Sequence, residues 1–484
     1  MADNNNKIPF RQLLLQYSNT ALNIIFPLVL FPYMTRTLGP EGYGIIGYYE
    51  SLLSIVAILS SFGVQYFGLK QLSKSAIGAV DQANTVLHLL LINIVMAVAG
   101  MLVYLVYVFS RPMQEGLAPI TFLYAWAMLI YIIHLDWYFQ SQEKFKLIFI
   151  RTFIARLFVL IAAFVFVRKP ADLIYYILIS AINYTFIAGF AIWKIKPLFA
   201  QWKWDPQLFK TLIKSLWPFA ILGFLGLFYF SFDTILLARI GPLKEVGYYA
   251  VAAKIVRIGL NVFTGASVVF FVKLFRSDIS QQLQADSLLM TIHLSFPIAA
   301  ILFFFAEPVI LFISGNKYLP SVELLQIFSL LWLIVPFHYF FNLQVFMVNN
   351  KEWLILRIFL VASVLSLLLN IVLIQYWQSV GAAWAIVLTE AVVLASFIAF
   401  SRGLFRLHKP QLLEIIAVLA VFPIAYLVYQ VSHRFINNHL MQLMAGTLIT
   451  LLLHVPIQYF LFRSSFWRNV KKALPWQKGP NHPV

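Results

Sequence analysis

The chain has 484 residues, of which 62% are hydrophobic and only 11% are charged. Soluble domains carry about 25% charged residues, so this composition excludes a soluble globular protein and indicates an integral membrane protein. The complete absence of cysteine excludes disulfides and thiolate metal sites.

About 14 apolar stretches of roughly 20 residues predict an all-α, polytopic membrane protein, since each stretch is long enough to cross a bilayer. In chain order they lie at residues 12–35, 43–66, 84–108, 117–138, 147–167, 171–193, 211–237, 246–272, 286–313, 322–348, 353–376, 380–400, 411–432 and 440–462. No strand-like alternation competes with them. The first run is too long for the core of a cleavable signal peptide.

The formal net charge of +17 is concentrated at alternate ends of the predicted helices, and five lysines fall between residues 194 and 214 alone. The positive-inside rule then places both termini in the cytoplasm. Topology and attraction to anionic headgroups explain the charge. We therefore expect membrane lipids as partners and no nucleic acid.

One short stretch of sequence occurs twice. Arg36-Thr37-Leu38-Gly39-Pro40-Glu41-Gly42-Tyr43-Gly44 returns as Arg239-Ile240-Gly241-Pro242, followed after an insertion by Glu245-Val246-Gly247-Tyr248-Tyr249. Arg36 and Arg239 are 203 positions apart, which predicts a duplicated block, and paired membrane lobes are typical of transporters. We expect a six-helix lobe over residues 1–200, a homologous six-helix lobe over 201–405, and two further helices with a basic cytoplasmic tail over 406–484.

The sequence has no P-loop, no Rossmann glycine motif and no histidine pair with metal-binding spacing. The predicted outer loops are short, whereas a membrane polymerase or ligase would carry a sizeable one. We therefore expect no enzyme and no cofactor beyond a coupling ion. Histidines within the apolar segments are more typical of hydrogen-bonded packing than of a proton relay: His88, His134, His293, His338 and His454.

Three local motifs occur in order along the chain. They are Leu38–Gly44, Asp136–Gln140 with Glu143–Phe145, and Leu369–Ile374 with Gly381–Ala383. Together they resemble Wzx-type flippases of the multidrug/oligosaccharidyl-lipid/polysaccharide (MOP) exporter superfamily. The resemblance implies two lobes in a MATE-like V-shaped arrangement that alternates access to a central cavity.

The same resemblance implies a multi-pass protein of the bacterial cytoplasmic (inner) membrane. Its implied substrate is an oligosaccharide repeat unit linked to undecaprenyl pyrophosphate, moved from the inner to the outer leaflet for polysaccharides such as O-antigen. Glycan polymerase machinery is then an expected partner. A peptidoglycan lipid-precursor flippase and a cation-coupled multidrug antiporter of the same superfamily stay open as alternatives, although an antiporter for cationic drugs would need an acidic cavity.

Three basic residues lie well inside apolar segments: Arg156, Lys254 and Arg257. A charge at a helix centre costs roughly 2.5–3.5 kcal/mol on insertion scales, so such residues usually face a cavity or a partner. Lys254, Arg257 and Asn261 share one helix face, which suggests a pyrophosphate clamp. The alternatives are ion pairs, of Lys254 and Arg257 with Glu50 and of Arg156 with Asp136.

The first predicted helix carries a stripe of amides: Gln12, Gln16, Asn19 and Asn23. They can line the cavity and bind sugar hydroxyls, or hold neighbouring helices together. Arg11 and Lys214, again 203 positions apart, would flank the cytoplasmic entrance, although residues near the interface can also snorkel to the headgroups.

A second set of polar residues suggests ion coupling. Asp233, Asn370, Thr389 and Glu390 lie at comparable depth on three predicted helices of the second lobe. The resemblance implies a sodium site here, Glu390 could instead carry a proton, and Asp233 could form a structural ion pair with Lys254 or Arg257. Na⁺ and H⁺ therefore both stay open as the coupling ion.

Two further expectations concern packing. Asp136 and Trp137, at the inner end of the fourth predicted helix, suggest an interfacial anchor, because tryptophan favours the headgroup level. The last two predicted helices either form a groove for the lipid tail or only stabilise the fold.

Overall fold

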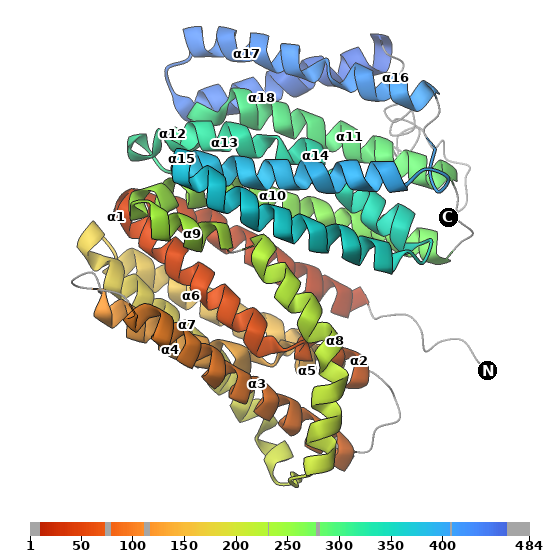
Figure 1. The fold of residues 1–484 in the computed structure, drawn as a ribbon. Coiled ribbons are helices and arrows are strands. Elements are labelled where there is room, and N and C mark those ends of the chain that lie inside the picture. The colour runs from red at the N-terminus through yellow and green to blue at the C-terminus, as the bar shows by residue number, and fades with distance from the viewer. Residues whose placement is uncertain are drawn as a thin grey trace. The chain divides into compact units, whose positions relative to one another are not determined.

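The computed structural model describes residues 10–72, 79–110, 117–230, 232–276, 281–406 and 409–461. Every regular element among these residues is a helix (Figure 1), which confirms the predicted all-α class. By its internal contacts the chain divides into two units, Met1–Gly247 and Tyr248–Val484. Each unit is described by itself.

Unit 1 is built around the long helix α1, which packs against α3, α4, α6, α8 and α9. Its elements are α1 (Phe10–Ser61), α2 (Val64–Leu72), α3 (Ala79–Phe109), α4 (Ala118–Tyr131), the 3₁₀ turn η1 (Ile132–His134), α5 (Asp136–Ser141), α6 (Phe145–Phe166), η2 (Pro170–Asp172), α7 (Leu173–Phe199), α8 (Pro206–Phe230) and α9 (Phe232–Ile240). Helix α10 (Leu243–Arg276) begins in unit 1 and continues into unit 2.

Unit 2 packs α11 against α13, α14, α16 and α17. Its elements are α11 (Gln281–Phe304), α12 (Ala306–Ile313), the 3₁₀ turn η3 (Asn316–Tyr318), α13 (Ser321–Ser329), α14 (Leu331–Phe340), the π-helix η4 (Phe341–Met347), α15 (Glu352–Phe400), α16 (Lys409–Val418), α17 (Val421–Phe435), α18 (His439–Pro456) and the π-helix η5 (Ile457–Leu461).

Ten helices of the described part are long and apolar enough to cross a membrane. Two of them, Ile25–Ser61 with 37 residues and Glu352–Phe400 with 49, exceed a single crossing, which needs about 20 residues. Each contains one residue with non-helical backbone, Gly39 (φ 72°, ψ 178°) and Gln378 (φ 46°, ψ −122°). Each long helix is therefore two predicted helices joined at a sharp kink.

The kink in α15 brings its two arms close together. A Cβ on Gly381 would lie 2.1 Å from the carbonyl oxygen of Leu373, so only glycine fits there. Gln378 takes the left-handed conformation at the turn, which is uncommon for a residue with a side chain. The close approach explains why glycine follows the turn.

The last helices contribute to the core of unit 2. Val418, Val421 and Ala425 are buried in one cluster with residues of α11, α14, η4 and α15. Helix α18 packs on α12, where Gly446 leaves room for the ring of Phe305.

The predicted division of the chain into lobes at residues 200 and 405 rests on the internal duplication and stays a prediction.

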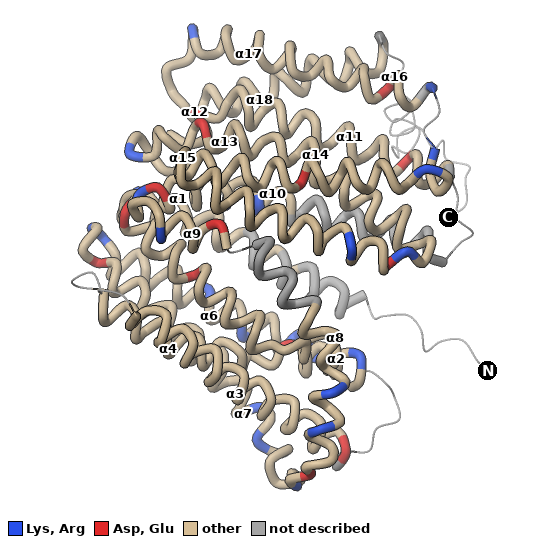
Figure 2. The backbone as a smooth tube through the Cα atoms, viewed as in Figure 1, with Lys and Arg blue, Asp and Glu red and all other residues tan. Residues whose placement is uncertain are grey.

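Charged residues gather mainly at the ends of the helices (Figure 2). The helix faces between those ends expose large apolar side chains instead, among them Ile154, Ile161 and Phe164 on α6 and Val364 and Leu368 on α15. Such faces are suited to lipid rather than water, which agrees with the ten candidate membrane helices.

The two copies of the repeated stretch touch each other within unit 1. A Cβ on Gly44 would lie 1.8 Å from the carbonyl oxygen of Leu243, and a Cβ on Gly247 would lie 1.9 Å from that of Pro40. Gly44 and Gly247 are 203 positions apart, and so are Pro40 and Leu243. The contact is thus reciprocal, as in an interface with two-fold symmetry, and it needs a residue without a side chain at the same place in both copies.

Candidate functional site

The structure describes the side chains of only some of the predicted substrate residues. Six belong to α1 or α10, but their side chains lie outside the described part: Arg11, Gln12, Gln16, Asn19, Asn23 and Asn261. Lys214 is exposed on α8. The amide stripe therefore stays a prediction.

Arg156 on α6 is half-buried and belongs to a polar cluster inside unit 1. Its charge acts on the hydroxyls of Tyr131 and Tyr184, and the charge of Glu50 acts on Tyr184 as well. The rings of Tyr131 and Tyr184 meet edge to face, with their centroids 5.4 Å apart. These four residues, from α1, α4, α6 and α7, are here named the Glu50–Arg156 cluster.

A carboxylate, a guanidinium and two phenol hydroxyls offer donors and acceptors of several kinds in a half-buried place. This combination suits a polyhydroxylated ligand with an anionic group. Sequence reasoning identified Arg156 but missed Tyr131 and Tyr184, because tyrosines are frequent in this chain and nothing in their spacing set these two apart.

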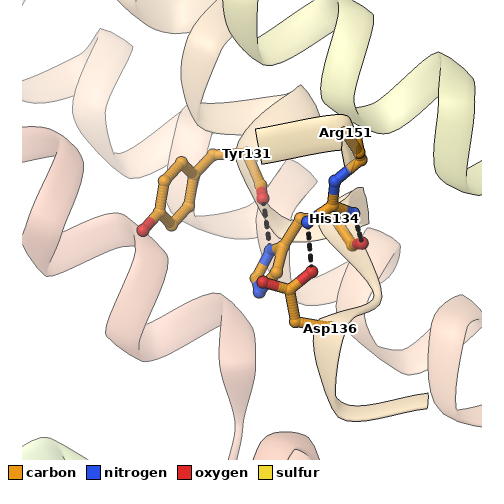
Figure 3. Close-up of polar contacts among 4 residues, drawn as sticks. All are labelled: Tyr131, His134, Asp136 and Arg151. Atoms are coloured by element: carbon orange, nitrogen blue, oxygen red, sulfur yellow. Dashed lines mark hydrogen bonds and ion pairs between the residues drawn. The ribbon is translucent and has the colours of Figure 1, made fainter. Parts of the chain in front are cut away.

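Asp136 forms its ion pair with Arg151 (Figure 3), and not with Arg156, which the sequence left open as an alternative. Arg151 also donates a hydrogen bond of 2.8 Å to the backbone oxygen of His134. The His134 ring in turn bonds the backbone oxygen of Tyr131, at 2.9 Å from Nδ1. Arg151 therefore ties the end of α4, the turn η1 and the start of α5 to α6. It is 2% exposed.

The prediction that Trp137 anchors the protein at the membrane interface is wrong. Trp137 is 3% exposed, and its ring packs where a Cβ on Gly68 would lie, 2.6 Å from Cε3. The indole is thus part of the core between α2 and α5. Gly68, the glycine opposite it, lies beyond the end of the predicted helix 43–66 and gave no signal in the sequence.

Lys254 and Arg257 lie three residues apart on α10, where Lys254 is half-buried and Arg257 is exposed. Both have interaction partners. Their spacing puts them on neighbouring positions of one helix face, as expected.

The four predicted coupling residues fall into different units and make different contacts. Asp233 lies in unit 1 at the start of α9, where its Oδ1 accepts hydrogen bonds from the Thr234 backbone N–H at 2.6 Å and from the Thr234 hydroxyl at 3.1 Å. The other three lie in unit 2 on α15. The prediction that all four converge stays a prediction.

On α15, Asn370 and Thr389 bond their own helix. The Asn370 amide donates to the Ser366 backbone oxygen at 2.8 Å, and the Thr389 hydroxyl donates to the Ala385 backbone oxygen at 2.7 Å. The Asn370 Oδ1 is buried with no hydrogen-bond partner in the described part of the chain. Both side chains act as donors in these bonds, so the Asn370 Oδ1 and the lone pairs of the Thr389 hydroxyl are left to offer to a cation.

Glu390 instead reaches another helix. Its Oε2 lies 2.7 Å from Nδ1 of His338 on α14, and both side chains are buried. The rings of Phe359 and Phe397 pack around the imidazole, at centroid distances of 6.0 and 6.4 Å. A hydrogen bond of this length holds one proton between imidazole and carboxyl. His338 is hydrogen-bonded, as expected of a packed histidine, but the sequence did not indicate that its partner is an acid.

His338 also lies next to irregular backbone. Pro336 precedes it in α14, and the π-helix η4 begins three residues after it. π-Helical turns are rare and frequently occur at functional sites. A second histidine–carboxylate contact in unit 2, His293 Nε2 to Glu414 Oε1 at 3.7 Å, joins α11 to α16.

Among the described residues, no three or more His, Asp or Glu side chains lie close enough together to hold a metal ion.

Comparison with known proteins gives matches along most of the chain. Residues 14–271, more than half of it, match the family described as polysaccharide biosynthesis protein. A protein of Escherichia coli (strain K12) named as an O-antigen transporter is 22% identical over 412 residues, covering 83% of this chain and 98% of that protein. A protein of Shigella dysenteriae with the same name is 24% identical over 404 residues, covering 79% and 98%.

Two solved structures share the fold. The lipid II flippase MurJ in an inward closed conformation has a TM-score of 0.72 at 15% identity, covering 95% of this chain and all of that one. A MOP superfamily transporter from Pyrococcus furiosus has a TM-score of 0.53 at 11% identity, covering 81% and 94%. Together with the two relatives, the family match over residues 14–271 confirms the resemblance drawn from the three motifs: the chain belongs to the polysaccharide biosynthesis protein family.

Proposed function

We propose that the chain is a flippase of the bacterial inner membrane. It moves oligosaccharide repeat units linked to undecaprenyl pyrophosphate from the inner to the outer leaflet by alternating access, for a surface polysaccharide such as O-antigen. The observation that carries this proposal is the family match, together with relatives named as O-antigen transporters that are covered over 98% of their length. The Glu50–Arg156 cluster supports it, because it offers sugar-binding hydroxyls beside a cation.

The proposed topology has 14 transmembrane helices and two cytoplasmic termini. At 1.5 Å per residue, α1 (Phe10–Ser61, 52 residues) is about 78 Å long and α15 (Glu352–Phe400, 49 residues) about 74 Å, against a hydrocarbon core of about 30 Å. Each can therefore cross twice, at the kinks Gly39 and Gln378. Helices α8 and α10, with 25 and 34 residues, are also long enough to cross. Together these assignments support the count of 14.

In this proposal Arg156, Lys254 and Arg257 bind the pyrophosphate at different stages of transport. Arg257 offers a planar fork that can bind two phosphate oxygens, whereas Lys254 offers a point charge. The amides of α1 and Asn261 bind sugar hydroxyls, and Arg11 and Lys214 attract the headgroup at the cytoplasmic entrance.

Coupling to an ion is proposed for Asp233, Asn370, Thr389 and Glu390, with Na⁺ or H⁺ as the ion. The contact between Glu390 and His338 favours H⁺, because both partners can gain or lose a proton. Asn370 and Thr389 both act as donors to their own helix, so the amide oxygen and the hydroxyl lone pairs stay available as ligands for Na⁺.

The proposed function can be tested by measuring surface glycan in a strain that lacks its own exporter and expresses this chain instead. The wild-type chain should restore the glycan, and Arg257→Ala should not, at equal membrane abundance, whereas Arg402→Ala on the same unit serves as the matched control. Arg257→Lys should restore little, because the fork is lost. Rescue of a strain depleted of its peptidoglycan-precursor flippase, without rescue of the glycan, would contradict the proposed substrate.

A further inference from the structure

A basic hollow lies on unit 1 between α6 and α7, apart from the Glu50–Arg156 cluster. It has a volume of about 340 Å³ and is lined by Lys144, Lys146, Leu147, Ile150, Phe190 and Lys194. Three of the six lining residues are lysines, all exposed, and none is acidic. The surface of the hollow itself is almost entirely apolar, so the lysines line it with their aliphatic stems and carry their ammonium groups at its border.

Two of the lysines are held in place by aromatic rings. The Lys194 Nζ lies 4.0 Å from the ring centroid of Trp193 and 5.7 Å from that of Phe190. The Lys144 Nζ lies 5.9 Å from the ring centroid of Tyr138. Cation–π contacts of this length stabilise an ammonium group over the ring, so less side-chain freedom has to be lost when an anion binds.

The rest of the lining is apolar and continues onto the membrane-facing surface. Leu147, Ile150 and Phe190 form it, and Ile150 is 42% exposed. Further along α6, Phe153 and Ile154 are exposed as well. A ligand with an anionic head and an apolar chain would find both parts of this surface complementary.

We infer that this hollow and the apolar face of α6 hold an acyl chain of an anionic bilayer phospholipid, whose phosphate is bound by the ammonium groups of Lys144, Lys146 and Lys194 at the border of the hollow. Basic pockets between transmembrane helices on the cytoplasmic side are suited to such headgroups. The site is separate from the proposed substrate path. Arg156 lies ten residues beyond Lys146 on α6, about 15 Å along the axis, and does not line the hollow.

The test compares two triple variants of the full-length protein in phosphatidylcholine nanodiscs, titrated with cardiolipin and followed by native mass spectrometry. The pocket variant is Lys144→Gln, Lys146→Gln and Lys194→Gln. The matched control is Lys196→Gln, Lys203→Gln and Lys210→Gln, which removes the same charge from exposed positions outside the hollow. Binding should weaken about fivefold per pocket lysine, hence roughly 100-fold for the pocket variant, and stay within about twofold of wild type for the control.

Equal losses in both variants would show diffuse attraction to a basic surface and overturn the site, as would unchanged binding in the pocket variant. Phe190→Ala keeps all three charges but removes one ring and part of the apolar lining, and should weaken binding by a smaller factor. A competition experiment with undecaprenyl pyrophosphate distinguishes a phospholipid site from a substrate site. If undecaprenyl pyrophosphate displaces cardiolipin from this hollow, the hollow belongs to the substrate path instead. None of these measurements depends on transport.

Discussion

Buried ionisable groups are partnered differently in the two units. In unit 1, Arg151 pairs with Asp136, and the buried His88 has Nδ1 2.7 Å from the Asn84 backbone oxygen while Nε2 accepts from the Asp205 backbone N–H at 3.2 Å. In unit 2, two of the buried histidines face carboxylates instead, His338 with Glu390 and His293 with Glu414.

The difference concerns what a proton can do in each unit. Arginine stays charged at any pH that the protein meets, and the His88 ring bonds only backbone groups. Imidazole and carboxyl can each gain or lose a proton, and in unit 2 they meet across helices at the His338–Glu390 contact. A proton can therefore be shared between side chains of two helices at this contact, which the Arg151–Asp136 pair of unit 1 does not allow.

The largest expected effect comes from removing the acid in unit 1. Asp136→Asn leaves a guanidinium buried beside a neutral amide, and breaking a buried ion pair in this way costs 3–5 kcal/mol. Because the Asp136 side chain is 32% exposed, we expect about 3 kcal/mol or slightly less. The measurement is the free energy of unfolding in detergent, with Glu143→Gln as an exposed control. A change below about 0.5 kcal/mol would mean that water already screens Arg151.

The second-largest loss of stability is expected when the contact between the two copies of the repeat is disturbed. Gly44→Ala and Gly247→Ala each place a Cβ within 2 Å of a carbonyl oxygen, so the backbones must separate, at a cost of about 1–3 kcal/mol. Because the contacts are reciprocal, the two variants should destabilise the protein by similar amounts. Gly189→Ala, which has no atom within 4 Å of its Cβ, is the control. Markedly unequal losses would contradict the two-fold relation.

Glu390→Gln should destabilise unit 2 less than Asp136→Asn destabilises unit 1. The amide can still bond His338, and the imidazole can become neutral, so the loss is that of one hydrogen bond, about 1 kcal/mol. In proteoliposomes, the variant should lose the response of transport to an imposed proton gradient while keeping its response to substrate. If wild-type transport follows a sodium gradient alone, the assignment of H⁺ is wrong.

The smallest stability effect is expected within the Glu50–Arg156 cluster. Tyr184→Phe removes one half-buried hydroxyl, so the free energy of unfolding should change by less than about 1 kcal/mol. Glycan export should nevertheless fall at low substrate supply, because a sugar contact is lost. Tyr175→Phe, on the exposed face of the same helix, is the control, and equal export by both variants would exclude Tyr184 from the substrate path.

Composition and apolar run lengths were sufficient to predict the helical class and most membrane segments, because hydrophobic length is a local property. The three motifs were sufficient for the family. Pairings across helices could not be predicted, as Asp136 with Arg151 and Glu390 with His338 show, because the spacing of residues within one helix carries no information about which residue of another helix it meets. Trp137 was misassigned for the same reason, since its burial depends on Gly68 in another helix.

The reciprocal contact of Gly44 and Gly247 has a consequence for the history of the chain. Duplicated segments normally diverge independently, each accumulating side chains that suit its own surroundings. Here each copy packs against the other, because Gly44 meets Leu243 and Gly247 meets Pro40. Each copy therefore limits which substitutions the other can accept. A bulky residue gained in either copy would be tolerated only after a change in the other, so at this point of the molecule the two halves have to evolve as a pair.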